Sequence, residues 1–252
     1  MQAPSLSISC TDASLQAIAQ SLAIKLALPY TELDPQQIQL VVDNEHIEIR
    51  APDLGNPVFI DFEAGKNAHR RQFGGGRGQP LAKAIGLKQG ATPTVIDATA
   101  GFGRDAFVLA HLGCELTLVE RNPLIATLLS DALIRAVNNS EIAPIISRMK
   151  LVNQDSVSYL QQLATIDYPD VIYMDPMYPG RDKTALVKKE MQLLHQLAGP
   201  DTDSEQLLTS ALTTAKKRVV VKRPKSAPFV GDQTPSTKIE SKNTRYDVYI
   251  TF

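Results

Sequence analysis

A short segment of the chain, Asp175-Pro176-Met177-Tyr178, combines residue types that can hold and activate a planar amine. It directly follows the apolar run 171–174, which predicts a buried strand ending at the aspartate. A carboxylate and a carbonyl at that position can accept the N–H groups of an amine, and proline fixes the backbone that presents the carbonyl. Tyrosine adds a flat surface on which a nucleobase can stack. We therefore predict that Asp175, Pro176 and Tyr178 are catalytic.

The segment is similar to the Asn/Asp-Pro-Pro-Tyr/Phe signature of amino-group methyltransferases, with Met177 in place of the second proline. The lone pair of an exocyclic amine is delocalised into its ring, and acceptors on the N–H groups free it for attack. Methyl transfer then depends mainly on the alignment of nitrogen, methyl carbon and sulfur. A strand-end turn with a buried tyrosine is the structural alternative.

A second segment, from Asp97 to Asp105, has the composition of a nucleotide-binding turn. Gly101 and Gly103 stand where a predicted strand passes into a predicted helix, so that backbone N–H groups can approach a ligand closely. The segment fits the D-x-G-x-G-x-G pattern of methyltransferases except at Thr99. The same glycines also fit the dinucleotide fingerprint G-x-G-x-x-A, so a nicotinamide oxidoreductase is an alternative.

Charged residues around this turn suit S-adenosylmethionine, which carries a sulfonium, an ammonium and a carboxylate. Asp97 would attract the cationic end, and Arg104 with Asp105 would bind the amino-acid moiety. Glu120, after the next strand, would accept both ribose hydroxyls, because a carboxylate is an acceptor with two oxygens. Arg121 would flank the adenosine.

After the third predicted strand, Asp155 and Ser156 are placed near the adenine. Asp155 would accept the adenine amino group, cap the next helix, or do both. The predicted cofactor-binding residues are Asp97, Gly101, Gly103, Arg104, Asp105, Glu120, Arg121, Asp155, Ser156 and Asp175.

Strands alternate with helices from residue 94 onward, which favours parallel strands with helices on both faces. The predicted strands span residues 94–98, 115–120, 149–153, 170–174 and 217–222, and the predicted helices span residues 105–112, 123–137, 157–163, 184–197 and 204–215. Two further strands at the C-terminus predict an antiparallel hairpin. The predicted fold class is α/β, with the seven-stranded, mostly parallel sheet of class I (Rossmann-like) S-adenosylmethionine-dependent methyltransferases.

A small α+β domain is predicted over residues 1–79, followed by the methyltransferase domain over 80–252. The small domain would contain a helix (11–28), a hairpin (38–42 and 46–50), a third strand (57–62) and a basic, glycine-rich loop. A short helix begins at Pro80.

The net charge of the 252 residues is −1, but two long spans contain basic residues and no acidic ones, residues 64–96 and 206–231. Such local patches predict an anionic partner bound at one face. The two cysteines and four histidines show no metal-ligand spacing, so no metal is predicted. No signal peptide or membrane span is evident, which predicts a cytoplasmic protein.

The chain resembles the ribosomal RNA small subunit methyltransferase J family. The matching segments are AHRRQFGGGRG, DATAGFGRDAFVLA, ERNP, DPMYP, ALVKKEM and KRVVVKRP, in the family's order. The resemblance implies S-adenosylmethionine as cofactor, S-adenosylhomocysteine as product and N2 of a guanine in 16S rRNA (guanine 1516) as target. It implies cofactor binding at residues 104–105, 120–121, 155–156 and 175, although the family has a pair of serines where this chain has Asp155 and Ser156.

The same resemblance implies contacts with 16S rRNA or the small ribosomal subunit, with no membrane and no obligate protein partner. The predicted RNA-binding residues are Arg70, Arg71, Arg77, Lys188, Lys222 and Arg223. Three alternatives remain: an amino-group methyltransferase acting on DNA adenine or a protein amide, the oxidoreductase, and a non-catalytic RNA-binding module.

Overall fold

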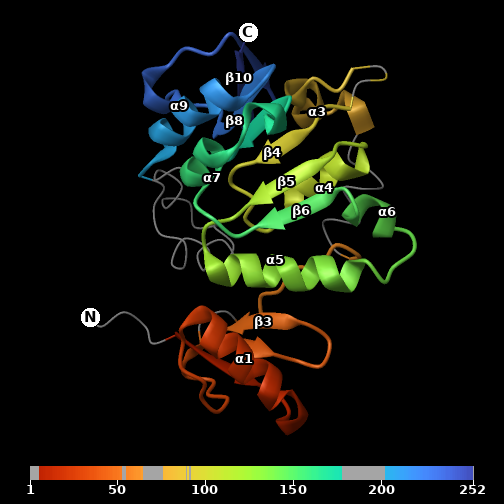
Figure 1. Cartoon of the computed structure of the whole chain (residues 1–252), viewed down its shortest axis with the longest axis vertical. Coiled ribbons are helices and arrows are strands. Elements are labelled where there is room, and N and C mark those ends of the chain that lie inside the picture. The colour runs from red at the N-terminus through yellow and green to blue at the C-terminus, as the bar shows by residue number, and fades with distance from the viewer. Residues whose placement is uncertain are drawn as a thin grey trace.

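The computed structural model describes residues 6–52, 55–64, 76–88, 90, 92–177 and 202–251. These residues form two sheets, one of three strands and one of seven (Figure 1). The seven-stranded sheet has the strand order β6-β5-β4-β7-β8-β10-β9. Its first five strands are parallel, and β10 runs antiparallel to both β8 and β9. The predicted fold class is thereby confirmed.

The strands of the large sheet are β4 (Val95–Asp97), β5 (Leu116–Val119), β6 (Met149–Val152), β7 (Val171–Met174), β8 (Arg218–Pro224), β9 (Thr237–Glu240) and β10 (Thr244–Ile250). The helices around it are α3 (Pro80–Ile85), α4 (Arg104–His111), α5 (Pro123–Ala136), α6 (Ala143–Ile146), α7 (Ser156–Gln162) and α9 (Ser204–Thr214). Each lies within a residue or two of the predicted element where one was predicted. The helix predicted over residues 184–197 lies outside the described residues.

Local chemistry explains where the helices begin. The side chain of Asn122 caps α5 by accepting the N–H groups of Leu124 and Ile125, and Pro123 occupies the first turn, where a missing N–H costs nothing. Asp155 caps α7 in the same way by accepting the N–H of Ser158. Both caps follow directly after strands, so each helix starts at the carboxyl edge of the sheet.

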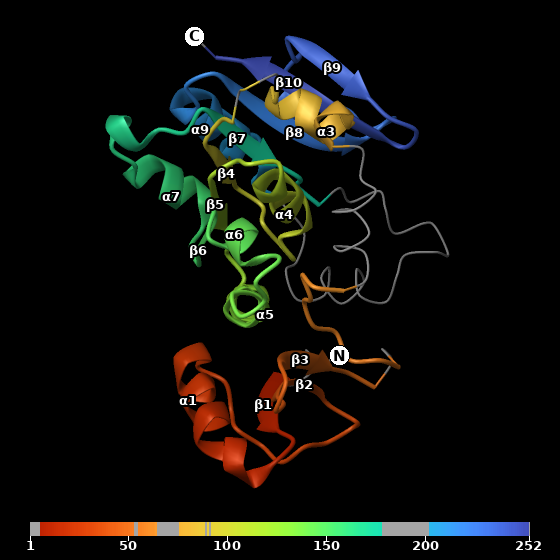
Figure 2. The same ribbon diagram turned by 90° about the vertical axis from the view of Figure 1, so that its right-hand side faces the viewer.

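Helices cover both faces of the large sheet (Figures 1 and 2). One apolar cluster contains the buried residues of α3, α4 and α5, together with alternate strand residues such as Val95, Leu118 and Tyr173. A second cluster contains those of α7 and α9, with the other strand residues, such as Ile96 and Ile172. Because successive side chains of a strand point to opposite faces, each central strand contributes to both clusters.

The strand order reverses between β4 and β7. From β4 the chain proceeds outward through β5 and β6 on one side, and through β7 and β8 on the other. In open α/β sheets this switch point, at the carboxyl ends of the strands, is where ligands bind. Both segments singled out from the sequence follow these two strands.

The N-terminal part forms a smaller sheet of β1 (Leu6–Cys10), β2 (Ile38–Val42) and β3 (Ile47–Arg50), packed against α1 (Gln16–Leu26). The hairpin of β2 and β3 and the helix were predicted. β1 was not; it pairs in parallel with β2.

The strand predicted over residues 57–62 is wrong. Only Val58 forms a bridge, to Ile49. The alternation that suggested a strand is real, because Val58, Ile60 and Phe62 are all buried. Those side chains pack into the core, although the segment pairs with β3 at Val58 alone.

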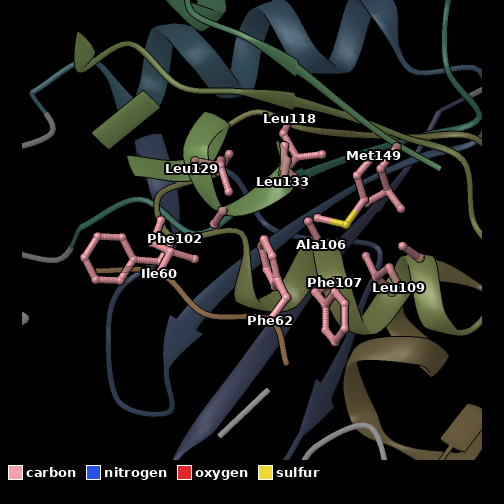
Figure 3. Close-up of a cluster of buried hydrophobic side chains, with 14 of the residues drawn as sticks. Ile60, Phe62, Phe102, Ala106, Phe107, Leu109, Leu118, Leu129, Leu133 and Met149 are labelled. Atoms are coloured by element: carbon pink, nitrogen blue, oxygen red, sulfur yellow. The ribbon is translucent and has the colours of Figure 1, made fainter. Parts of the chain in front are cut away.

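The small sheet lies beside α5, which separates it from the large sheet in both views (Figures 1 and 2). The Ile47 N–H donates to Asp131 of α5 (3.2 Å), and Arg135 of α5 donates to the carbonyl of Ile60 (2.6 Å). Phe62 stacks on Phe107 of α4, with ring centroids 4.9 Å apart (Figure 3). The division of the chain at residue 79 stays a prediction.

Candidate active site at the carboxyl edge of the sheet

The tips of β4 and β7 are joined by hydrogen bonds. Asp97 pairs with Tyr173 in the parallel register, and the Ala98 N–H donates to the Tyr173 carbonyl (2.9 Å). One step further, the Asp175 N–H donates to Oγ1 of Thr99 (2.6 Å). Thr99 is the residue that departs from the glycine pattern. Its hydroxyl links the glycine turn to the segment after β7, so the departure has a structural role.

Asp97 is a buried carboxyl group, 2% exposed. Burial raises the pKa of Asp97 to about 8, the N–H of Thr99 opposes this shift, and the charges of Asp105 and Asp175 add to it. A carboxyl group in this environment ionises more readily when a cation is placed beside it. Asp97 is therefore suited to a cationic ligand.

The glycine turn presents its backbone to the same place. Gly101 and Gly103 both have positive φ, +52° and +68°, a conformation that side chains disfavour. The Gly101 N–H donates to Oε2 of Glu120, and the Asn122 N–H donates to Oε1, each at 2.8 Å. These bonds fix the Glu120 carboxylate, which has about four lone-pair sites in all. The backbone at Gly101 and at Asn122 thus sets the orientation of Glu120, the residue predicted to accept the ribose hydroxyls.

A lysine and two carboxylates meet between α4, β7 and β8. Nζ of Lys222 lies 2.7 Å from Oδ2 of Asp105 and 2.8 Å from Oδ2 of Asp175. The Tyr173 hydroxyl donates to the same Asp105 oxygen (2.7 Å), and burial raises the pKa of Tyr173 well above its ordinary value. The site therefore contains Asp97, Asp105 and Asp175 with one ammonium among them.

The two predicted cofactor-binding arginines have other contacts. The guanidinium of Arg104 lies over the ring of Phe102, 5.3 Å from its centroid. Arg121 makes an ion pair with Asp203 at 2.9 Å. Arg104 still begins α4 beside Asp105, whereas Arg121 faces the start of α9.

Asp155 and Ser156 support the turn between β6 and α7. Asp155 Oδ1 accepts the N–H and the hydroxyl of Ser158, at 2.9 and 2.8 Å. The Ser156 hydroxyl donates to the carbonyl of Ala98 (2.7 Å), which attaches α7 to the tip of β4. Asp155 is thus the helix cap that the sequence allowed as one of its roles.

Two of the predicted RNA-binding residues, Lys222 and Arg223, make contacts within the protein, and their binding to RNA stays a prediction. Lys222 lies between two carboxylates, and its side chain is 21% exposed. Arg223 is 7% exposed and donates to the carbonyl of Pro228 (3.2 and 3.3 Å). Both residues lie at the carboxyl edge of the sheet, but the sequence does not show which way their side chains turn.

Arg77 is exposed and donates to the carbonyls of Lys88 (2.9 Å) and Leu112 (3.2 Å). Leu112 follows the C-terminus of α4, so Arg77 lies at the opposite end of this helix from Arg104. Its contact with RNA stays a prediction. The other predicted residues, which are Tyr178, Arg70, Arg71 and Lys188, lie outside the described residues.

Sequence reasoning missed Thr99, Tyr173 and the inward orientation of Lys222. One signal was available for Tyr173: a tyrosine in a fully apolar strand buries its hydroxyl and needs a polar partner. For Lys222 no local signal exists, because its two partners come from elements far away in the chain.

S-adenosylmethionine fits the residues assembled here. The cofactor is cationic and amphiphilic, and the site offers the buried carboxyl of Asp97, the fixed carboxylate of Glu120 and two glycines without side chains. In the described parts of the chain, no three His, Cys, Asp or Glu side chains are grouped as a metal site would require.

Comparison with known proteins shows the family of the chain. The family model of SAM-dependent methyltransferases, SAM_MT, matches residues 21–251. A crystal structure of the SAM-dependent methyltransferase NGO1261 from Neisseria gonorrhoeae superimposes with a TM-score of 0.77 and 34% identity, covering 98% of this chain and 96% of that one. Fold, site and family thus define a class I S-adenosylmethionine-dependent methyltransferase.

Curated relatives specify the family further. The ribosomal RNA small subunit methyltransferase J of Aeromonas salmonicida is 52% identical over 95% of both chains. The protein of the same name from Pseudomonas aeruginosa is 47% identical over 98% of this chain and 95% of its own. The chain belongs to the ribosomal RNA small subunit methyltransferase J family.

The described helices include none that is both long and apolar enough to cross a bilayer.

Proposed function

We propose that this enzyme transfers a methyl group to the exocyclic N2 of a guanine in 16S rRNA, at guanine 1516, in the cytoplasm. The proposal rests on the relatives' names and on one observation: Asp175 is tied through its backbone N–H to Thr99, in the turn that follows Asp97 (2.6 Å). The residue proposed as amine acceptor and the turn proposed to bind the cofactor therefore follow adjacent strands. The nicotinamide alternative is set aside by the family to which the chain belongs.

Bound S-adenosylmethionine would supply an electrophilic methyl group on a sulfonium. The chain's own residues do the rest. Asp97, Glu120 and the glycine turn would hold the cofactor, and Asp175 with the Pro176 carbonyl would accept the N–H groups of the guanine amine. Those acceptors favour the pyramidal amine, whose lone pair is available for attack. Asp175 would then take the proton that the nitrogen loses.

Contacts with the RNA are proposed from sequence. Arg70, Arg71 and Lys188 belong to segments that match the family, and their cations suit phosphate contacts. Tyr178, the second residue after Pro176, would stack on the flipped base. Replacing Arg70 and Arg71 with alanine should weaken RNA binding and make the affinity depend less steeply on salt concentration.

The deciding experiment measures methyl transfer from labelled S-adenosylmethionine to 16S rRNA and to small subunits, with Asp175→Asn beside the wild type. We expect the turnover of Asp175→Asn to fall by about a hundredfold or more, the usual contribution of a positioned proton acceptor. Cofactor affinity should change much less. Asp170→Asn is the matched control, because Asp170 precedes the other end of β7 and pairs with Lys217 there.

Unchanged turnover in Asp175→Asn would remove Asp175 from the reaction. Methyl transfer to DNA or protein, without transfer to rRNA, would favour the other amino-group methyltransferases. Mapping the methylated nucleotide in cells with and without the gene tests the position.

A further inference from the structure

Lys222 occupies a place that the methyl-transfer scheme has not used. Its ammonium contacts two carboxylates from different elements, Asp105 in the first turn of α4 and Asp175 after β7, at 2.7 and 2.8 Å. An ammonium has three donors, and these contacts use two of them. One side of the lysine thus meets a predicted cofactor residue, and the other meets the proposed amine acceptor.

The strands fix the lysine stem. Met174 pairs with Val221, so Lys222 and Asp175 are the next residues along β8 and β7. On its other side Lys222 pairs with Tyr246 of β10. Val219, Val220 and Val221 before it are completely buried. With a strand on each side the backbone of Lys222 is fixed, and its side chain leaves the sheet on the same face as that of Val220.

Three carboxyl groups lie close together around Lys222, and a cation among them offsets their mutual repulsion. Asp97, Asp105 and Asp175 approach one another from β4, α4 and the end of β7, and the Tyr173 hydroxyl and Tyr246 face the same cluster. Burial alone would lower the pKa of Lys222, but the carboxylates of Asp175 and Asp105 outweigh it and raise the pKa well above its ordinary value. Lys222 is therefore an ammonium at neutral pH.

We propose that Lys222 is a positioning residue, whose ammonium holds the Asp175 carboxylate in the orientation that accepts the substrate amine and couples it to Asp105 at the start of α4. This inference rests on the proposed function. It replaces the expectation that Lys222 binds RNA phosphate. Without the ammonium, Asp175 would turn away from the neighbouring Asp105 carboxylate, and a displacement of about 1 Å in such a site costs roughly a hundredfold in rate.

The test is a double-mutant cycle of Lys222→Met and Asp175→Asn, read as kcat and KM for RNA. Methionine keeps the length of the stem and removes the charge. We expect kcat of Lys222→Met to fall by about a hundredfold, with KM for RNA nearly unchanged. The double variant should be about as slow as Asp175→Asn alone, because a residue that acts through Asp175 has nothing further to lose.

Lys217→Met is the matched control. It removes a lysine that pairs with Asp170 at the opposite end of the same strands, where Nζ and Oδ1 lie 2.9 Å apart. Turnover of this control should stay close to wild type. Lys222→Arg, which keeps the charge, should recover part of the lost turnover. If Lys222→Met does not fold, Lys222→Gln carries the same cycle, since its amide keeps a donor without the charge.

Three results would overturn the inference: losses that multiply in the double variant, a Lys222→Met enzyme as active as the control, or an effect confined to KM and its salt dependence, which would return Lys222 to phosphate binding. A wild-type enzyme that fails to methylate rRNA would instead reject the proposed function. The two failures are therefore distinguishable.

Discussion

Replacing Asp97 with asparagine tests how the cofactor site is charged before anything binds. Asp97 is 2% exposed, and burial, together with Asp105 and Asp175, raises its pKa to about 8. At neutral pH the empty site therefore holds Asp97 mostly as a neutral acid. Asparagine has the same shape and keeps an oxygen for the Thr99 N–H, but it cannot ionise.

The sign of the stability effect follows from the two pKa values of Asp97, 3.8 as the ordinary value and about 8 in the folded protein. Between them the folded state binds more protons than the unfolded state, so stability falls as the pH rises. The slope is about 1.4 kcal/mol per pH unit well below the folded pKa and about half of that at the folded pKa. From pH 6 to pH 8 the wild type should thus lose about 2 kcal/mol at this residue.

Urea unfolding at the two pH values measures this difference. The Asp97→Asn variant should escape the loss, so its free energy of unfolding relative to wild type should improve by about 2 kcal/mol on going from pH 6 to pH 8. Asp232→Asn, at an exposed aspartate, should follow the wild type at both. Parallel pH dependence in wild type and Asp97→Asn would refute the reasoning.

The pH dependence of cofactor binding is a second test of the protonation of Asp97. A cationic ligand beside Asp97 favours the ionised form, so binding below pH 8 should release a proton. The affinity of the wild type for S-adenosylmethionine should then rise by up to about tenfold per pH unit below the folded pKa. Calorimetry in two buffers with different protonation enthalpies detects the proton. Asp97→Asn should bind more weakly and release none; equal proton release would refute the assignment.

Two further changes test the turn itself. Thr99→Val removes the hydroxyl that accepts the Asp175 N–H, so it should lower the free energy of unfolding by about 1–2 kcal/mol and reduce methyl transfer. Thr99→Ser keeps the hydroxyl and should retain both properties. Identical behaviour of the two variants would show that the hydroxyl has no role. Gly103→Ala, at φ +68° with its Cβ 3.0 Å from Leu129 Cδ1, should lower the free energy of unfolding by about 1–3 kcal/mol. Gly90→Ala, at φ +75° with no described atom within 4 Å of the added Cβ, shares only the backbone strain, so an equal loss there would show that crowding at residue 103 has no effect.

Local patterns were enough to predict most of the large sheet. The strands from β4 to β8 are short apolar runs separated by helical segments, of which α5 and α7 begin at side-chain caps, and this alternation favours parallel pairing. β1 escaped prediction because its partner, β2, lies far along the chain and its buried positions include Ser7 and Ser9. Ser7 belongs to a polar cluster with Thr31 and Gln39, whose amide donates to the Ser7 hydroxyl (3.2 Å). Because these buried side chains are polar, β1 lacks the apolar alternation from which a strand is predicted.

The order of the strands is enough to predict which residues lie at the candidate site, but not which partners their side chains have. Asp97 ends one parallel strand, and Glu120 and Asp175 follow two others, so their position at one edge follows from the strand order. The partners of Lys222 and Arg223 do not follow from it, because both residues stand at that edge and only packing decides between solvent and interior. Lys222 turns to carboxylates, and Arg223 turns to the Pro228 carbonyl.

Phe62 lies behind the glycine turn. Its ring is 1% exposed, stacks on Phe107 of α4, and would lie 3.3 Å from a Cβ added to Gly103. A residue from the stretch that precedes Pro80 thus forms the floor beneath the turn. The part of the chain after residue 79 consequently depends on a residue that precedes it. A shortened chain starting at residue 80 would lack Phe62, and Phe107 would be uncovered. A fusion of this part to a different N-terminal segment would need an aromatic side chain of the same shape in that place.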